Sequence, residues 1–329
     1  MTADLDQEGG PTVTVVTAAY SMDRWPLTCA AIESVLAQTK APLEILVPVD
    51  HNPELFHRLN ARWSRTPSSD GIPSISVVES RYEGNLSASA RTAAELAQGE
   101  ILAFLDDDAS ALPDWLERLV APLADPSVVA VGGAPLPAYA KARPRWFPAE
   151  FDWVFGCAYE GLPTSPAPIH HLIGTTMAVR TRDYLALGRM RSDGHEDMEL
   201  SHRLLASRPG AKLIYEPRAV VLHHVSEARL RWSYFWRRCF FGNREKVFAM
   251  RALGPAANLE AERKFVRRAV GRGVSHGIAQ FIRGDVGGAL RAGSICIGVA
   301  LAGGGYALGT LEFLLRQRTK HDLSRPARR

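Results

Sequence analysis

The stretch LSASARTAAELAQGEILAFLDDDASALPDWLERL, residues 86–119, decides the fold of this chain. A helical stretch leads through Gly99 and Glu100 into the apolar run ILAFL at 101–105, three aspartates follow at once, and a helix begins near Pro113. A short apolar run between two helical stretches is typical of a strand buried inside a parallel sheet. The aspartates therefore stand at the carboxyl end of a buried strand.

The same alternation of apolar runs and helical stretches extends on both sides of this segment. It predicts further strands at 13–17, 43–49, 74–78 and 128–132, and helices at 25–38 and 112–123. This order favours an α/β fold in which helices flank a single, mostly parallel sheet, with a helical C-terminal appendage. We expect a flexible N-terminus at 1–11, a catalytic domain at 12–225, a helical region at 226–285, and an apolar, glycine-rich segment with a basic tail at 286–329.

Composition and missing motifs exclude several classes of protein. The net charge of the 329 residues is only +4, which gives no reason to expect a nucleic-acid partner. No G-x-G-x-x-G follows the first strand and no G-x-x-x-x-G-K-[ST] occurs, so dinucleotide and P-loop enzymes are disfavoured. The four cysteines show no metal-type spacing, and residues 1–11 lack a signal-peptide pattern, so we expect a reducing, cytoplasmic location.

The three aspartates are the sharpest chemical feature. Asp106 and Asp108 are two residues apart, so they point to one side of an extended chain and can share a cation through hard oxygen ligands. We expect Mn²⁺ or Mg²⁺ there, bridging the two phosphates of a donor. A solvated acidic turn at the start of the next helix is the alternative.

A second acidic segment, Gly194-His195-Glu196-Asp197, precedes a helical stretch. Asp197, with Glu196 beside it, is a candidate general base that takes a proton from an attacking hydroxyl. The alternative is a simple preference for acids in the first turn of a helix. His223 or His224, at the end of a predicted strand, is a further candidate ligand for the cation.

Together these blocks resemble glycosyltransferase family 2, inverting enzymes of the GT-A fold, over roughly residues 12–225. The resemblance rests on TVTVVTAAYSMDRWPLTCAAIESVLAQT, PLEILVPVDHNPE, the 86–119 block and GHEDMELSHRL. It implies a nucleotide diphosphate sugar donor, with a UDP-sugar expected, and it makes Asp197 the base. The donor-binding residues that it implies are Thr17, Ala19, Tyr20, Asp50, Asn85, Arg91, Asp106 and Asp107. The Q-x-x-R-W element of processive synthases is absent, which favours transfer of a single sugar.

Residues 292–311 carry no charge and are just long enough to cross a bilayer, but they contain many glycines. They predict either contact with a membrane surface or a buried helical hairpin. The acceptor hydroxyl can accordingly belong to a lipid-linked sugar or to a small soluble molecule. Two other functions stay open at this stage: a nucleotidyltransferase on a related sheet, and a non-catalytic membrane-associated protein of glycan assembly.

Overall fold

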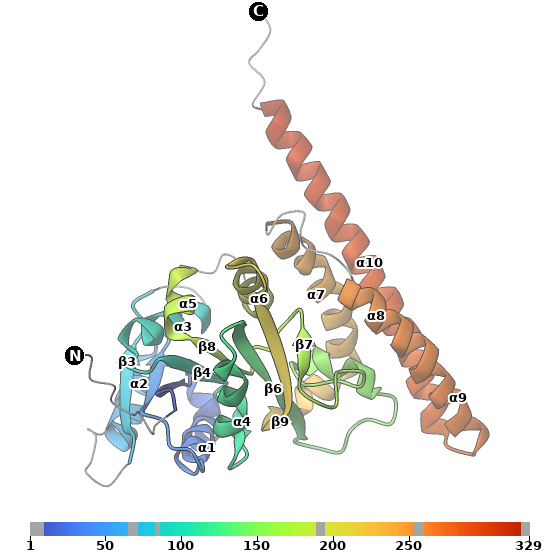
Figure 1. Cartoon of the computed structure of the whole chain (residues 1–329). Coiled ribbons are helices and arrows are strands. Elements are labelled where there is room, and N and C mark those ends of the chain that lie inside the picture. The colour runs from blue at the N-terminus through green and yellow to red at the C-terminus, as the bar shows by residue number, and fades with distance from the viewer. Residues whose placement is uncertain (1–9, 65–71, 83–85, 189–194, 253–259, 324–329) are drawn as a thin grey trace, which may run out of the picture. The chain divides into compact units, whose positions relative to one another are not determined.

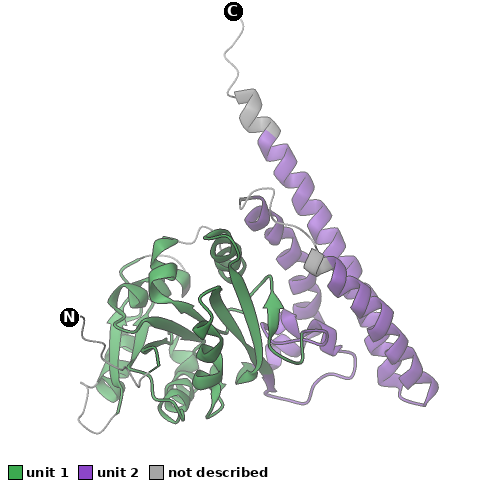
Figure 2. Ribbon diagram, viewed as in Figure 1, with its two compact units in different colours: residues 1–136, 163–190, 196–224 green, residues 137–162, 191–195, 225–329 purple. Residues whose placement is uncertain are grey.

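The computed structural model describes residues 10–64, 72–82, 86–188, 195–252 and 260–323, which form two compact units (Figure 2). Unit 1 contains residues 1–136, 163–190 and 196–224, and unit 2 contains residues 137–162, 191–195 and 225–329. Each unit has its own hydrophobic core.

A nine-stranded sheet is built from the described residues, almost wholly in unit 1, in the order β3-β2-β1-β4-β8-β6-β9-β5, with β7 on β9. Its strands are β1 (Val13–Val16), β2 (Glu44–Val49), β3 (Ser74–Glu79), β4 (Ile101–Leu105), β5 (Ala109–Ala111), β6 (Val128–Tyr139), β7 (Ala167–Ile169), β8 (Thr176–Arg180) and β9 (Lys212–Val225). The first four are parallel, and β8 runs antiparallel between β4 and β6. The mostly parallel sheet predicted from the sequence is confirmed.

Helices cover both faces of this sheet, as Figure 1 shows. One core joins the sheet to α1 (Trp25–Leu36), α2 (Pro53–Trp63) and α4 (Trp115–Val120), and the other joins it to α3 (Leu86–Leu96), α5 (Thr181–Ala186) and α6 (Glu196–Ala206). In β4, Ile101, Ala103 and Leu105 face the first core, whereas Leu102 and Phe104 face the second. This strand is apolar throughout because both of its faces are buried.

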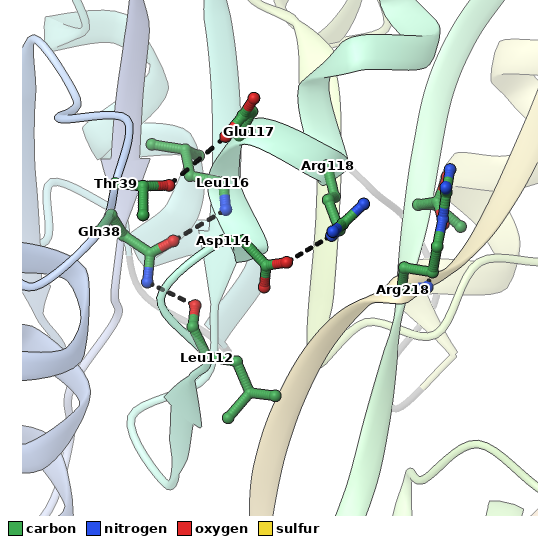
Figure 3. Close-up of polar contacts among 9 residues, drawn as sticks. Gln38, Thr39, Leu112, Asp114, Leu116, Glu117, Arg118 and Arg218 are labelled. Carbon is green, nitrogen blue, oxygen red and sulfur yellow. Dashed lines mark hydrogen bonds and ion pairs between the residues drawn. The ribbon is translucent and has the colours of Figure 1, made fainter.

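The segment that follows the aspartates is held by Gln38, just beyond the end of α1 (Figure 3). Its amide nitrogen donates to the Leu112 carbonyl at 2.8 Å, and its amide oxygen accepts from the Leu116 N–H at 2.9 Å. Because Gln38 is buried, these bonds satisfy both polar ends of its amide and hold the turn that leads into α4. The turn between β5 and α4 thus has a defined position relative to α1.

Unit 2 contains four α-helices in its described part: α7 (Trp232–Ala252), α8 (Glu260–Arg268), α9 (Ser275–Ile282) and α10 (Val286–Leu323). A π-helical segment, Ala269–Val274, joins α8 to α9. The segment 135–168, which is rich in proline and aromatic residues, contributes η3 (Ala149–Phe155), whose Phe151 and Phe155 pack with Phe235 of α7 in the core of this unit. Phe147, Phe151 and Phe155 of this segment are therefore core residues of unit 2.

The glycine-rich segment of the sequence is continuous helix. Gly298, Gly305 and Gly309 lie on the side of α10 that packs against unit 2, where a Cβ would collide with the Phe151 ring or with the α7 backbone at Phe240 and Arg244. Small residues allow two helix backbones to approach closely, which offsets the low helix propensity of glycine. The helix is thus stabilised by packing rather than by intrinsic propensity.

Candidate active site

The three aspartates lie where β4 ends, in a turn held by neighbouring strands. The Asp106 N–H donates to the Thr175 carbonyl at 3.1 Å, just before β8, and the His224 N–H donates to the Asp108 carbonyl at 2.8 Å. In the β5–β9 ladder, Ala109 stands opposite His223. The carboxylates therefore sit at the carboxyl end of β4, in a turn held by Thr175 just before β8 and by His224 of β9.

Asp106, Asp108 and His223 form a group that fits a divalent cation. One ligand atom from each lies within 4.8 Å of the others, and His223 Nε2 is 3.2 Å from Asp108 Oδ1. Two carboxylates and one imidazole are suitable donors for Mn²⁺, and the carboxylates alone suit Mg²⁺. His224 is the next residue on β9 and is outside this group, so of the two predicted histidines only His223 brings a side-chain ligand atom to the acids.

Arg24 is a site residue that the sequence reasoning missed. Its Nη1 lies 2.6 Å from Asp107 Oδ1, its Nη2 lies 3.0 Å from Asp108 Oδ2, and its guanidinium stacks over the Tyr20 ring at 4.8 Å. The strand order could have pointed to Arg24, because β1 and β4 are adjacent parallel strands, and the loops that follow them meet at one edge of the sheet. An arginine in the loop after the first strand is therefore placed to reach the aspartates.

Burial makes three negative charges unfavourable here. It raises the pKa of Asp107 to about 7, although the guanidinium of Arg24 opposes that shift. The pKa of Asp106 is also raised, first by burial and then by the charge of Asp108. Asp107 Oδ2 is buried without a hydrogen-bond partner among the described residues. A bound cation would offset this accumulated negative charge.

Asp197, the candidate base, stands in the first turn of α6 and is connected to the same place. Its carboxylate accepts from the Met198 N–H at 2.7 Å and from the Gly174 N–H at 3.3 Å. Gly174 immediately precedes Thr175, whose carbonyl holds the Asp106 N–H. The segment 174–175 thus contacts both acidic regions, which lie about ninety residues apart in the sequence. Glu196 begins α6 and is partly buried.

The predicted donor-binding residues Thr17, Ala19, Tyr20 and Asp50 lie together where β1 and β2 end. Ala19 bridges Val49, and the Ala19 carbonyl accepts from the Asp50 N–H at 2.9 Å. Beside them is a cavity of about 290 Å³. Its lining residues are Val49, His51, Asn52, Pro53, Phe56, Glu79 and Ser80.

Arg91 has partners of its own within unit 1. Its Nε lies 2.7 Å from Glu95 Oε1, and its Nη1 donates to the Leu185 carbonyl at 3.3 Å. The side chain thus joins α3 to α5, and its contact with phosphate stays a prediction. Asn85 lies outside the described residues.

Comparison with known proteins gives a consistent result. The family model for glycosyl transferase family 2 matches residues 14–187. A curated relative, glucosyl-dolichyl phosphate glucuronosyltransferase of Haloferax volcanii, is 31% identical over 238 residues, which are 70% of this chain and 74% of the relative.

Two solved structures are similar in fold. A mannosyltransferase, PcManGT, from Pyrobaculum calidifontis in complex with GDP-Man and Mn²⁺ matches with a TM-score of 0.54 and 19% identity, over 91% of this chain and 88% of that one. GalNAc-T7 with UDP, GalNAc and Mn²⁺ matches with a TM-score of 0.51 and 17% identity, over 80% of this chain. The chain spans 55% of the length of that structure. These similarities confirm the GT-A fold expected from the sequence.

Proposed function

The chain belongs to glycosyltransferase family 2, and from this premise we propose that it transfers a single sugar from a UDP-sugar to a hydroxyl of a lipid-linked sugar, with inversion. The name of the 31% identical relative supports an acceptor carried on a polyprenyl phosphate. Neither a nucleotidyltransferase nor a non-catalytic assembly protein is favoured by these relatives.

The observation that carries this proposal is the meeting of two acidic regions at residues 174–175. Asp197 is bound by the Gly174 N–H, and Asp106 is bound by the Thr175 carbonyl. An inverting transfer needs a base on the acceptor side and positive charge on the leaving-group side of one sugar. Two acidic regions held by adjacent residues suit that division of roles.

We assign Asp197 as the base that takes the proton from the acceptor hydroxyl. Two backbone N–H groups orient its carboxylate, so it presents a fixed acceptor for that proton. The hydroxyl oxygen attacks the anomeric carbon from the face opposite the diphosphate, so a single displacement inverts the centre. Glu196 adds negative charge beside the base.

Asp106, Asp108 and His223 would hold a divalent cation, for which we propose Mn²⁺ or Mg²⁺. When bound, such a cation offsets the negative charge that develops on the departing diphosphate. Arg24 keeps Asp107 and Asp108 in position through its two ion pairs. Because Arg24 lies beside the proposed cation site, we propose that it also donates a charge-assisted hydrogen bond to a phosphate of the donor.

The nucleotide would lie at the carboxyl ends of β1 and β2, where ligands bind in open α/β sheets. We propose that the base enters the 290 Å³ cavity beside Asn52 and that Asp50 contacts the base or ribose. Thr17, Ala19 and Tyr20 form the neighbouring loop, and Asn85 and Arg91 are proposed to complete the donor site.

We further infer that the enzyme works at the cytoplasmic face of a membrane, where a lipid-linked acceptor is present. Its four cysteines are all free, which suits a reducing compartment. Among the described helices, one, spanning Val286–Gln317, is long and apolar enough to cross a bilayer by length and composition.

A donor and acceptor panel tests the proposal. The full chain with Mn²⁺ should transfer sugar from one of a set of UDP- and GDP-sugars, UDP-glucuronic acid included, to a sugar-polyprenyl phosphate, and proton NMR of the product should show inversion. Asp197→Asn should lower transfer by roughly two or more decades, the usual contribution of a general base. Asp114→Asn, a surface acid paired with Arg118, is the matched control and should retain activity. Near wild-type transfer by Asp197→Asn would contradict the assignment of the base.

A further inference from the structure

One side of α10 is exposed and entirely apolar over most of its length. Between residues 293 and 315 every exposed position is Gly, Ala, Cys, Ile or Leu, namely Gly293, Cys296, Ile297, Ala300, Gly303, Gly304, Ala307, Leu308, Leu311, Leu314 and Leu315. At 1.5 Å per residue this face is roughly 33 Å long. Soluble proteins rarely leave an apolar strip of this length uncovered.

The opposite side of α10 packs on a helix that carries charges. Gly305 and Gly309 lie against the α7 backbone, and Arg244 of α7 makes a two-pronged ion pair with Glu312 of α10. Away from α10, α7 exposes Arg237, Arg238 and Glu245, whereas the exposed Arg251 stacks over Phe313 of α10.

A span through the bilayer would carry this charged partner of α10 into hydrocarbon. Ionised side chains are unfavourable in hydrocarbon. The segment of α10 that is long enough to span a bilayer, Val286–Gln317, is also the segment against which α7 packs. A helix pair that is charged on one side and apolar on the other instead matches a position in the plane of the membrane interface.

The neighbouring α9 extends the apolar surface. Ile278, Phe281 and Ile282 are exposed, Ile282 at 79% of its full area. Basic residues outnumber acids in this part of the chain, since residues 263–317 contain eight Arg and Lys against two acids, Asp285 and Glu312. Both of those acids are already paired with arginines of unit 2. The exposed charge of this surface is therefore positive, and it complements anionic headgroups.

We propose that the exposed side chains of α9 and α10 form a docking surface that lies in the plane of an anionic lipid bilayer. The proposal rests on the membrane-bound acceptor inferred above and specifies how the enzyme reaches it. The apolar face enters the boundary between headgroups and acyl chains, while α7 stays on the aqueous side. The basic residues of α8, with Arg272 and Arg283 on either side of α9, contact the headgroups.

Vesicle binding by the full chain tests the surface directly. We expect binding to vesicles of phosphatidylcholine with phosphatidylglycerol, and weaker binding to phosphatidylcholine alone, by about fivefold for each basic residue in contact. Leu311→Asp and Ile297→Asp should each lower vesicle affinity by about tenfold or more. Leu43→Asp in unit 1 is the matched control, because Leu43 is 43% exposed and Ile297 47% exposed. Equal vesicle affinities of the wild-type, variant and control proteins would overturn the proposal.

Depth measurement separates an in-plane helix from a span. Cys296 is the one exposed cysteine, so it accepts a fluorophore, and Leu311→Cys in a Cys296→Ser background provides a second position. These positions are separated by about 22 Å along the helix axis. Lipids brominated at defined depths should quench both labels at the same shallow depth. Quenching of one label at the bilayer centre would indicate a span and overturn the proposal.

Two further outcomes would also contradict the proposed docking surface. A stable dimer in lipid-free buffer that does not bind vesicles would mean that a second copy of the chain covers this face. Transfer to a water-soluble acceptor, a sugar carried on a short-chain isoprenyl phosphate, measures the proposed function separately. Retained transfer without vesicle binding would refute only the docking surface, whereas vesicle binding without transfer to any acceptor would refute only the proposed function.

Discussion

Removing Arg24 should destabilise the protein far more than removing a surface arginine. In Arg24→Ala, Asp107 and Asp108 lose their cationic partner, and both carboxylates are buried, with Asp107 at 1% exposed. Breaking an ion pair buried in this way costs about 3 kcal/mol, because a charge is left uncompensated. That loss corresponds to a fall of roughly 6–12 °C in Tm for a unit of this size.

The matched control is Arg62→Ala. Arg62 pairs with Glu33 at 3.1 Å, but both side chains are about half exposed. An exposed pair contributes about 0–1 kcal/mol, so this variant should unfold close to the wild-type temperature. Both residues also stack on an aromatic ring, so the comparison isolates the buried ion pairs.

The penalty should depend on pH and on metal. The pKa of Asp107 is raised to about 7 by burial, so below that pH the carboxyl tends to be protonated and needs its partner less. The difference between Arg24→Ala and wild type should therefore shrink as the pH falls from 8 to 5. Mn²⁺ should restore part of the lost stability, because a cation at Asp108 replaces the missing charge.

Thermal unfolding followed by circular dichroism, at pH 8 and pH 5 and with and without Mn²⁺, measures all these effects. The reasoning is refuted if Arg24→Ala and Arg62→Ala unfold within about 0.5 kcal/mol of each other at pH 8, since that spread is typical of surface changes. It is equally refuted if the penalty for Arg24→Ala grows on acidification.

Three further changes test the site and the helical unit. His223→Ala should raise the Mn²⁺ concentration for half-maximal transfer by at least about tenfold, whereas His224→Ala should leave that concentration nearly constant. Titration of the activity of both variants with Mn²⁺ measures the difference. Gly305→Ala places a Cβ against the α7 backbone and should lower the free energy of unfolding by about 1–3 kcal/mol. In Gly303→Ala the added Cβ meets nothing within 4 Å, so the free energy of unfolding should rise by up to about 1 kcal/mol. Urea unfolding in which both variants changed stability in the same direction would contradict this packing of α10 on α7. Burial, together with the charges of Lys246 and Arg238, lowers the pKa of His195 to about 4, so its contribution to stability is complete above pH 6.5 and is lost as the pH falls through 4. His195→Gln should remove up to about 3 kcal/mol of that acid-induced loss, as unfolding between pH 7 and pH 4 would measure.

Much of unit 1 could be predicted from the sequence because its signals are local. A strand buried on both faces must be apolar throughout, so the runs that became β1, β2, β3 and β4 were recognisable without coordinates. Acids cannot continue into such a core, so Asp106 marked both the end of β4 and the candidate cation site. The functional importance of the carboxyl ends of parallel strands follows from the same topology.

The structure decided which distant residues meet, because such contacts depend on strand order and side-chain direction. Residues on a strand alternate between faces, yet the sequence alone could not tell which of His223 and His224 faced the acids. Arg24 was overlooked since its partners lie more than eighty residues away.

The glycines of α10 show the same limit. In the sequence they weakened the case for a helix, and no local pattern showed that Gly305 and Gly309 lie against the backbone of α7. Local composition thus determined the elements of this protein and the type of chemistry at its acids. The tertiary structure decided which residues share the site and which face of α10 is left exposed, because close approach between backbones and pairing of buried charges exist only in the folded chain.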